Sequence, residues 1–285
     1  MTEPLPALVS TEWLAARIGR PGLRVVDGSW YMPASGRDAK QEYEAAHLPG
    51  AVFFDLDASS DRRSPLPHML PPAGDFADRM ASLGLDDADD LVVYDGSGAN
   101  LSAARVWWMF RVFGHARTAL LDGGSGKWKA EGRPFESRAV GLARGRFHAQ
   151  LDRERVRDLI TMREVMARGR AQIVDMRSAG RFSGTEPEPR AGLRGGHIPG
   201  SVNLPYQELV APDGTVLSRP LLEHRLRAAG VDPSRPAVAT CGSGTSACTL
   251  IHALYLLGHD DVALYDGAWT EWGGRDDTPI ATGEP

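Results

Sequence analysis

One cysteine of this chain has a setting in which its thiol could act as a nucleophile. Cys241 follows the short apolar run 237–240 and precedes Gly-Ser-Gly-Thr-Ser, after which the apolar run 247–258 predicts a helix. Glycines let the backbone curl so that several N–H groups can point at one atom, and the start of a helix adds positive potential. Both effects favour the thiolate, which is the reactive form. The pattern predicts a catalytic cysteine, and the alternative is a buried structural cysteine in a glycine-rich turn.

The chain repeats itself once, and only the second copy of the glycine-rich loop holds a thiol. HLPGAVFFDLD at 47–57 is echoed by HIPGSVNLPY at 197–206, and LVVYDGSGAN at 91–100 is echoed by AVATCGSGTS at 237–246. In the first copy the position that corresponds to Cys241 is Asp95. Such a tandem duplication predicts one catalytic domain and one partner domain without the catalytic residue.

Each copy alternates short apolar runs, which end in Asp or Cys, with stretches typical of helices. This alternation predicts the α/β class, with two tandem domains that each have a mostly parallel sheet flanked by helices. Ligands then bind beyond the carboxyl ends of the strands. The predicted helices include 73–83, 102–113 and 220–229. The predicted domains are 1–140, without a catalytic cysteine, and 156–285, with it, joined by a linker at 141–155.

Composition and charge argue against several classes of protein. The 285 residues carry a formal net charge of -5 and no long basic run, which disfavours nucleic-acid binding. The apolar stretch 106–113 is broken by Arg111 and is too short to span a bilayer. The N-terminal segment has acids where a signal peptide would be basic. Two cysteines are too few for a disulfide scaffold or a zinc cluster. We therefore expect a cytoplasmic protein without a metal, a nucleic-acid partner or a membrane partner.

The two copies resemble the rhodanese family, which has HLPG- and HIPG-like segments at matching places of its domains. The loop at 241–246 is similar to the Cys-Gly-Ser-Gly-Val-Thr loop of the members that use 3-mercaptopyruvate, whereas members that prefer thiosulfate carry Cys-Arg-Lys-Gly-Val-Thr. Thr245 stands in place of the usual valine and Ser246 in place of the usual threonine. The resemblance spans residues 9–274. It implies two rhodanese-like domains and a persulfide on Cys241, with Gly242, Gly244, Thr245 and Ser246 around the donor.

Two arginines in the second copy bracket a segment with two prolines and two glutamates. A planar guanidinium suits recognition of a carboxylate. The resemblance implies that Arg181 and Arg190 hold the carboxylate and carbonyl of 3-mercaptopyruvate. The alternative is an ion pair with Glu186 or Glu188 inside the same domain. The neighbouring Arg177 is assigned to structure.

The resemblance also implies a polar relay that begins in the first copy. Asp57 and His68 would reach towards Ser243 and form a Ser/His/Asp relay, which can orient an imidazole and move a proton. Ser243 would not be the nucleophile here; the relay would polarise the donor or supply a proton to the departing enolate. The alternative is that His68 caps a loop and Asp57 ends a strand.

The family resemblance implies a sulfurtransferase that needs no cofactor. Cys241 would take sulfur from 3-mercaptopyruvate, release pyruvate, and pass the sulfur to thioredoxin, a small thiol or cyanide. A thiosulfate:cyanide sulfurtransferase is an alternative, although Gly242 and Ser243 offer a thiosulfate dianion no positive charge. A non-catalytic sulfur carrier is another, but it would not need Arg181, Arg190 and His68 together. A cysteine phosphatase is excluded, because it needs an arginine six positions after the cysteine, where this chain has Ala247.

Overall fold

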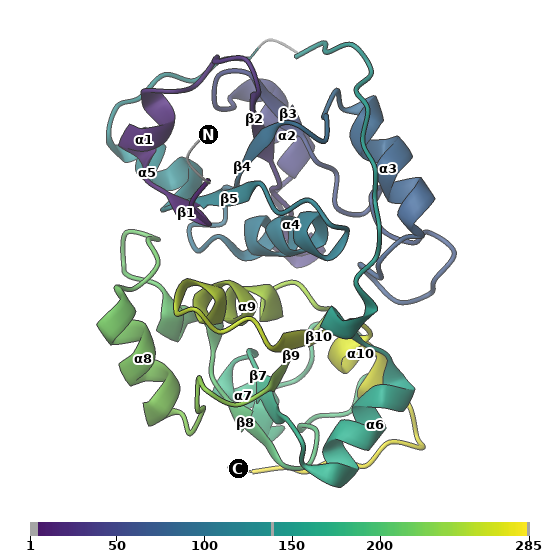
Figure 1. The fold of residues 1–285 in the computed structure, drawn as a ribbon. Helices are drawn as coiled ribbons and strands as arrows, with labels where there is room; N and C mark the ends of the chain where they lie inside the picture. The colour runs from purple at the N-terminus through teal and green to yellow at the C-terminus, as the bar shows by residue number, and fades with distance from the viewer. Residues whose placement is uncertain (1–4, 138–139, 284–285) are drawn as a thin grey trace. The chain divides into compact units, whose positions relative to one another are not determined.

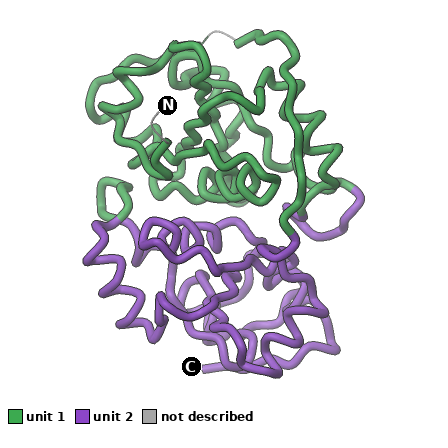
Figure 2. The backbone as a smooth tube through the Cα atoms, in the orientation of Figure 1, with its two compact units in different colours: residues 1–62, 70–152, 211–216 green, residues 63–69, 153–210, 217–285 purple. Residues whose placement is uncertain are grey.

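The computed structural model describes residues 5–137 and 140–283, and the chain divides into two compact units (Figure 2). The first unit comprises Met1–Arg62, Leu70–Asp152 and Ala211–Val216. The second comprises Arg63–Met69, Arg153–Val210 and Leu217–Pro285. Two short segments therefore belong to a different unit from their neighbours in sequence. One of them, Arg63–Met69, brings His68 into the unit that contains Cys241.

Among the described residues, each unit has one five-stranded sheet in which all paired strands run parallel. The order β1-β5-β4-β2-β3 in the first sheet recurs as β6-β10-β9-β7-β8 in the second. This identity of topology confirms the predicted pair of tandem α/β domains. The strands are β1 (Leu8–Val9), β2 (Leu23–Asp27), β3 (Ala51–Phe53), β4 (Asp90–Tyr94), β5 (Thr118–Leu121), β6 (Val156–Arg157), β7 (Gln172–Asp175), β8 (Ser201–Asn203), β9 (Ala237–Thr240) and β10 (Val262–Tyr265).

Helices flank both sheets, as the ribbon shows (Figure 1). In the first unit they are α1 (Thr11–Ala15), α2 (Ala39–Ala45), α3 (Ala73–Ser82), α4 (Leu101–Val112) and α5 (Gly124–Ala130). In the second they are α6 (Leu159–Arg168), α7 (Ala179–Ser183), α8 (Arg219–Ala228), α9 (Ala247–Leu256) and α10 (Ala268–Trp272). The predicted helices 73–83, 102–113 and 220–229 match α3, α4 and α8 to within one residue at each end.

The helix that follows the central strand is buried almost all round in each unit. Every residue of α9 from Ala247 to Leu254 is buried, and Trp107 and Trp108 of α4 are 1% and 2% exposed. The strands β9 and β10 are buried at every position, as expected for parallel strands covered on both faces. These rigid elements hold the loop that joins β9 to α9. None of the described helices has the length and apolar character needed to cross a membrane.

Candidate active site

The loop that carries Cys241 joins the end of β9 directly to α9. Cys241 is 2% exposed, and Gly244 adopts a left-handed conformation with φ +75°, which a residue with a side chain rarely adopts. Two carbonyls of the loop are held by α10: the N–H of Trp269 donates to Cys241 O at 2.9 Å, and the N–H of Thr270 donates to Gly242 O at 3.0 Å. The Thr270 hydroxyl adds a second bond to Gly242 O at 2.6 Å. The fold thus fixes the carbonyl groups of Cys241 and of the residue that follows it.

His68 lies beside this loop, within the same unit. Its Nδ1 is 3.2 Å from Ser243 Oγ and 3.0 Å from Thr245 Oγ1, and the ring is 3% exposed. The structure therefore brings together His68 and Ser243, as the family resemblance implied. Asp57 belongs to the first unit, where its Oδ2 accepts a hydrogen bond from Trp30 Nε1 at 3.0 Å.

The contact between the Thr245 hydroxyl and His68 could not be predicted from the sequence. The family resemblance places Thr245 only among the residues around the donor. The hydroxyl instead shares the His68 ring nitrogen with Ser243. The signal was present in the sequence, because Thr245 replaces a valine that has no hydroxyl. Its partner could not be found from sequence, since the two residues are 177 positions apart.

Arg181 of α7 lies against the cysteine loop. A Cβ atom at Gly242 would stand 2.9 Å from Arg181 Nη2, so the guanidinium touches the loop where a side chain would otherwise be. The same guanidinium pairs with Glu188, with Nη2 2.5 Å from Oε2. The ion pair that we gave as the alternative is therefore formed, and it is formed at the edge of the loop. Glu186 is exposed and accepts instead from the Ser178 hydroxyl at 2.8 Å. Arg190 is half-buried in the segment between α7 and β8.

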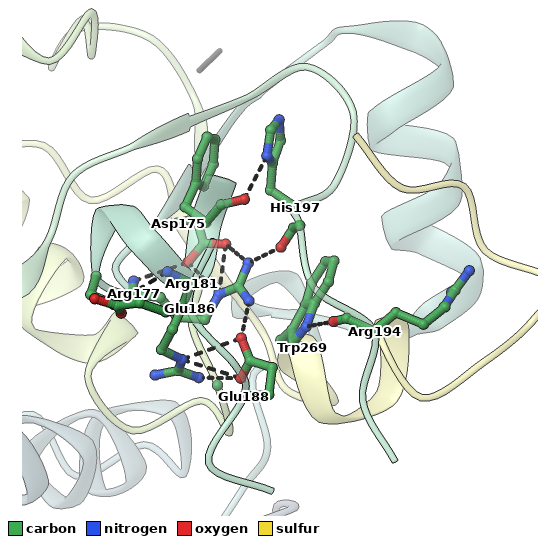
Figure 3. Close-up of polar contacts among 12 residues, drawn as sticks. Asp175, Arg177, Arg181, Glu186, Glu188, Arg194, His197 and Trp269 are labelled. Atoms are coloured by element: carbon green, nitrogen blue, oxygen red, sulfur yellow. Dashed lines mark hydrogen bonds and ion pairs between the residues drawn. The ribbon is translucent and has the colours of Figure 1, made fainter. Parts of the chain in front are cut away.

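A buried network of charges supports Arg181 (Figure 3). The guanidinium of Arg177 is paired with Asp175 at 2.6 Å and with Glu188 at 2.6 Å, and its side chain has no exposed surface. It also donates to Gly196 O at 2.8 Å and lies 4.2 Å from the centre of the Trp269 ring. Burial alone would lower the pKa of Arg177, but the carboxylates of Asp175 and Glu188 outweigh it, so the pKa is raised above its ordinary value. Arg177 stays a cation and anchors the network.

Asp175 ties this network to the central strand. It ends β7, where it lies opposite Thr240, the last residue of β9 before Cys241. Sequence reasoning gave Arg177 a structural role and assigned no role to Asp175. An aspartate that ends the corresponding strand in both copies, Asp27 and Asp175, was the available signal.

The corresponding loop of the first unit is filled by its own carboxylate. Asp95 is 1% exposed, and its Oδ1 accepts from the N–H and the hydroxyl of Ser97 at 2.8 Å and 2.6 Å. Its Oδ2 accepts from the Ser102 hydroxyl at 3.1 Å and from the N–H of Ala103 at 2.9 Å. Four donors thus converge on an internal anion in this copy. The second copy has a thiol at the same place.

Comparison with known proteins places both halves in one class of domain. The model of the rhodanese-like domain matches residues 10–131 and 160–275. The crystal structure of SseA from Escherichia coli, described as a 3-mercaptopyruvate sulfotransferase, superposes with a TM-score of 0.85 at 39% identity. The match covers 92% of this chain and 98% of that one.

Two curated relatives that are named for different sulfur donors are almost equally similar to this chain. Human 3-mercaptopyruvate sulfurtransferase is 47% identical over 272 residues, and bovine thiosulfate sulfurtransferase is 45% identical over 272 residues. Both alignments cover 93% of this chain and 91% of the relative. The overall identity is therefore nearly the same to a relative named for 3-mercaptopyruvate and to one named for thiosulfate.

Proposed function

This chain belongs to the rhodanese family and is a sulfurtransferase, and from that premise we propose that Cys241 carries the sulfur as a persulfide and that 3-mercaptopyruvate is the preferred donor. The observation that carries the proposal is the Cys241 loop, which has neutral residues at 242 and 243 and the Arg181 guanidinium at its edge. Such a loop suits a donor with a neutral sulfur end and a single remote carboxylate.

The first half of the reaction loads Cys241 with sulfur. The thiolate attacks the sulfur of 3-mercaptopyruvate, an S–S bond forms, and the C–S bond breaks. The electron pair of that bond stays on carbon, so pyruvate leaves as its enolate. The proton that the donor thiol brings is lost from the new persulfide, and one proton is gained by the enolate carbon. Atoms and charges balance, with no oxidant required.

We assign the handling of that proton to His68 and Ser243, whose Nδ1 and Oγ lie 3.2 Å apart. A buried imidazole in contact with a hydroxyl can pass a proton to or from a reacting group. We assign Asp57 to orient His68, as in a Ser/His/Asp relay. Gly244 and Ser246 are assigned to the backbone cradle around the persulfide, together with Gly242 and Thr245.

The arginines are assigned to the pyruvate end of the donor. Arg181 would bind the carboxylate of 3-mercaptopyruvate, and Arg190 would assist at the carboxylate or carbonyl. Thiosulfate would bring a second negative charge to a loop without a side-chain cation at 242 or 243, and an unpaired charge is costly to bury.

The second half of the reaction transfers the outer sulfur to an acceptor. Thioredoxin, a small thiol or cyanide can attack the persulfide and return Cys241 to its thiolate. We assign the reaction to the cytoplasm, which suits a chain with a formal net charge of -5 and only two cysteines.

One comparison tests the proposal. kcat/KM is measured with 3-mercaptopyruvate and with thiosulfate on the same preparation and with the same acceptor. We expect the larger value for 3-mercaptopyruvate. A larger value for thiosulfate would assign the chain to the thiosulfate-using class, and turnover with neither donor would indicate a sulfur carrier.

A further inference from the structure

Glu188 is a buried carboxylate that joins two arginines. Its side chain is 2% exposed, its Oε1 accepts from Arg177 Nη1 at 2.6 Å, and its Oε2 accepts from Arg181 Nη2 at 2.5 Å. Arg181 Nε lies 3.2 Å from both oxygens. Burying a carboxylate is costly unless it is paired and hydrogen-bonded. Both conditions are met here, and one of the two partners lies at the cysteine loop.

The anchor of Glu188 is rigid and is connected to the same loop. Arg177 is held by Asp175, by Gly196 O and by the Trp269 ring. The backbone N–H of Trp269 in turn donates to Cys241 O. Glu188 therefore fixes the Arg181 guanidinium relative to the backbone of the nucleophile.

The pairing also decides which side of Arg181 can meet a ligand. Glu188 occupies the edge formed by Nε and Nη2, which is the usual bidentate edge for a carboxylate. Among the hydrogen bonds and ion pairs of the described residues, none uses Arg181 Nη1. A donor carboxylate must then approach the end of the guanidinium that includes Nη1. The two carboxylates and two guanidiniums of the network cancel in formal charge.

We propose that Glu188 is a positioning residue that turns Arg181 end-on to the donor and so directs the donor sulfur at Cys241. This inference rests on the proposed function, since the ligand is the carboxylate of a 2-oxo acid donor. Without the Glu188 charge the network has a net positive charge and still attracts a carboxylate. The carboxylate of 3-mercaptopyruvate can then bind at the Nε–Nη2 edge of Arg181. Bound there, the molecule points its sulfur away from Cys241. Misplacement by about 1 Å can cost a large part of a rate.

The test separates binding from reaction in the variant Glu188→Gln. Binding is probed with pyruvate, whose Kd is measured by calorimetry. Reaction is followed as kcat with 3-mercaptopyruvate, divided by the fraction of chains that can be loaded with a persulfide on Cys241. That fraction is measured by intact mass, and the result is called the corrected kcat. We expect pyruvate to bind at least as tightly as it binds the wild type, while the corrected kcat falls at least tenfold. Arg181→Ala should have the opposite effect on binding and raise the Kd of pyruvate about tenfold or more.

Glu186→Gln is the matched control, because Glu186 lies two residues away, is exposed, and pairs with the Ser178 hydroxyl. It should match the wild type in both measurements. If Glu188→Gln does not fold, Glu188→Asp replaces it: this variant keeps the charge but shortens the side chain by one CH2 group, which should loosen the bridge between Arg177 and Arg181, and the same split is expected.

Two outcomes would overturn the inference. One is weaker pyruvate binding in the Glu188 variant, like that of Arg181→Ala; the other is a corrected kcat within twofold of the wild type. Failure of the proposed function looks different, because the wild type itself would then neither bind pyruvate nor turn over 3-mercaptopyruvate.

Discussion

His68 Nδ1 is shared by two hydroxyls, and this arrangement affects the proposed proton relay beside Cys241. Ser243 and Thr245 both lie within hydrogen-bond distance of the one ring nitrogen, at 3.2 Å and 3.0 Å. One nitrogen offers a single proton or a single lone pair in the ring plane. The two hydroxyls therefore compete for it.

Removing the Thr245 hydroxyl should favour the Ser243 contact. We expect Thr245→Val to raise kcat with 3-mercaptopyruvate by about two- to fivefold, the scale of one neutral hydrogen bond of about 1 kcal/mol. Steady-state kinetics against a pH series provide the measurement. Thr245→Ser keeps the hydroxyl and should behave like the wild type. A fall in kcat in Thr245→Val would show that Thr245 supports the relay.

Cys241 should be the one residue that holds sulfur. Incubation with 3-mercaptopyruvate, followed by intact-mass measurement, should show one added sulfur per chain. Cys241→Ser should abolish it. Cys248→Ser should not, because Cys248 lies inside α9, fully buried, with its Sγ 3.4 Å from Gly244 O. Sulfur that remains on the Cys241→Ser protein would refute the assignment.

At the scale of elements, the loop between β9 and α9 should set the choice of donor. The double change Gly242→Arg with Ser243→Lys adds two cations to the loop and should move the ratio of kcat/KM values towards thiosulfate. It should also impair 3-mercaptopyruvate use for two reasons: Ser243 leaves His68, and a side chain at 242 displaces Arg181 Nη2, which lies 2.9 Å from the Cβ position.

Both efficiencies should be measured at fixed ionic strength, since salt screens such charges. Gly242→Ala is the informative control, because it adds the Cβ without a charge. It should lower 3-mercaptopyruvate efficiency through Arg181 and leave the thiosulfate value closer to that of the wild type. An unchanged ratio in the folded double variant would place donor choice outside the loop.

The central elements could be predicted from sequence, and the edges could not. Strands such as β4 and β9 contain continuous apolar runs because both faces of the sheet are covered, and that signal is local. The edge strands β1 and β6 are two residues long and depend on pairing with β5 and β10, far along the chain. The partner of Arg181 could not be chosen from sequence for a different reason. Glu186 and Glu188 both lie close to Arg181 along the chain, and only the fold shows that Glu188 pairs with it.

At the scale of the whole molecule, the pH dependence of stability should include a term from His115. This ring is 7% exposed, packs against Phe147 at 5.3 Å, and has Nε2 3.0 Å from Asp89 O. Burial lowers the pKa of His115 below the ordinary 6.5, although the nearby carbonyl and carboxylates oppose it. Below pH 6.5 the unfolded chain therefore takes up a proton before the folded chain does, so stability falls as the pH drops from 6.5 towards the lowered folded value.

Urea unfolding at pH 7.5 and at pH 5.5 provides the measurement. The wild type should lose more stability between the two pH values than His115→Gln, whose amide can still donate to Asp89 O. Equal losses in the two proteins would show that His115 contributes nothing to the pH dependence.

The carboxylate of Asp95 has a consequence for inhibition. A small oxyanion can compete with the sulfur substrate only at a loop that has hydrogen-bond donors available. In the first unit the hydrogen-bond donors of the loop are already taken by the Asp95 carboxylate. An anionic competitor should therefore titrate one site per chain, although the chain contains two copies of the domain. Its inhibition curve should follow a simple one-site isotherm without cooperativity.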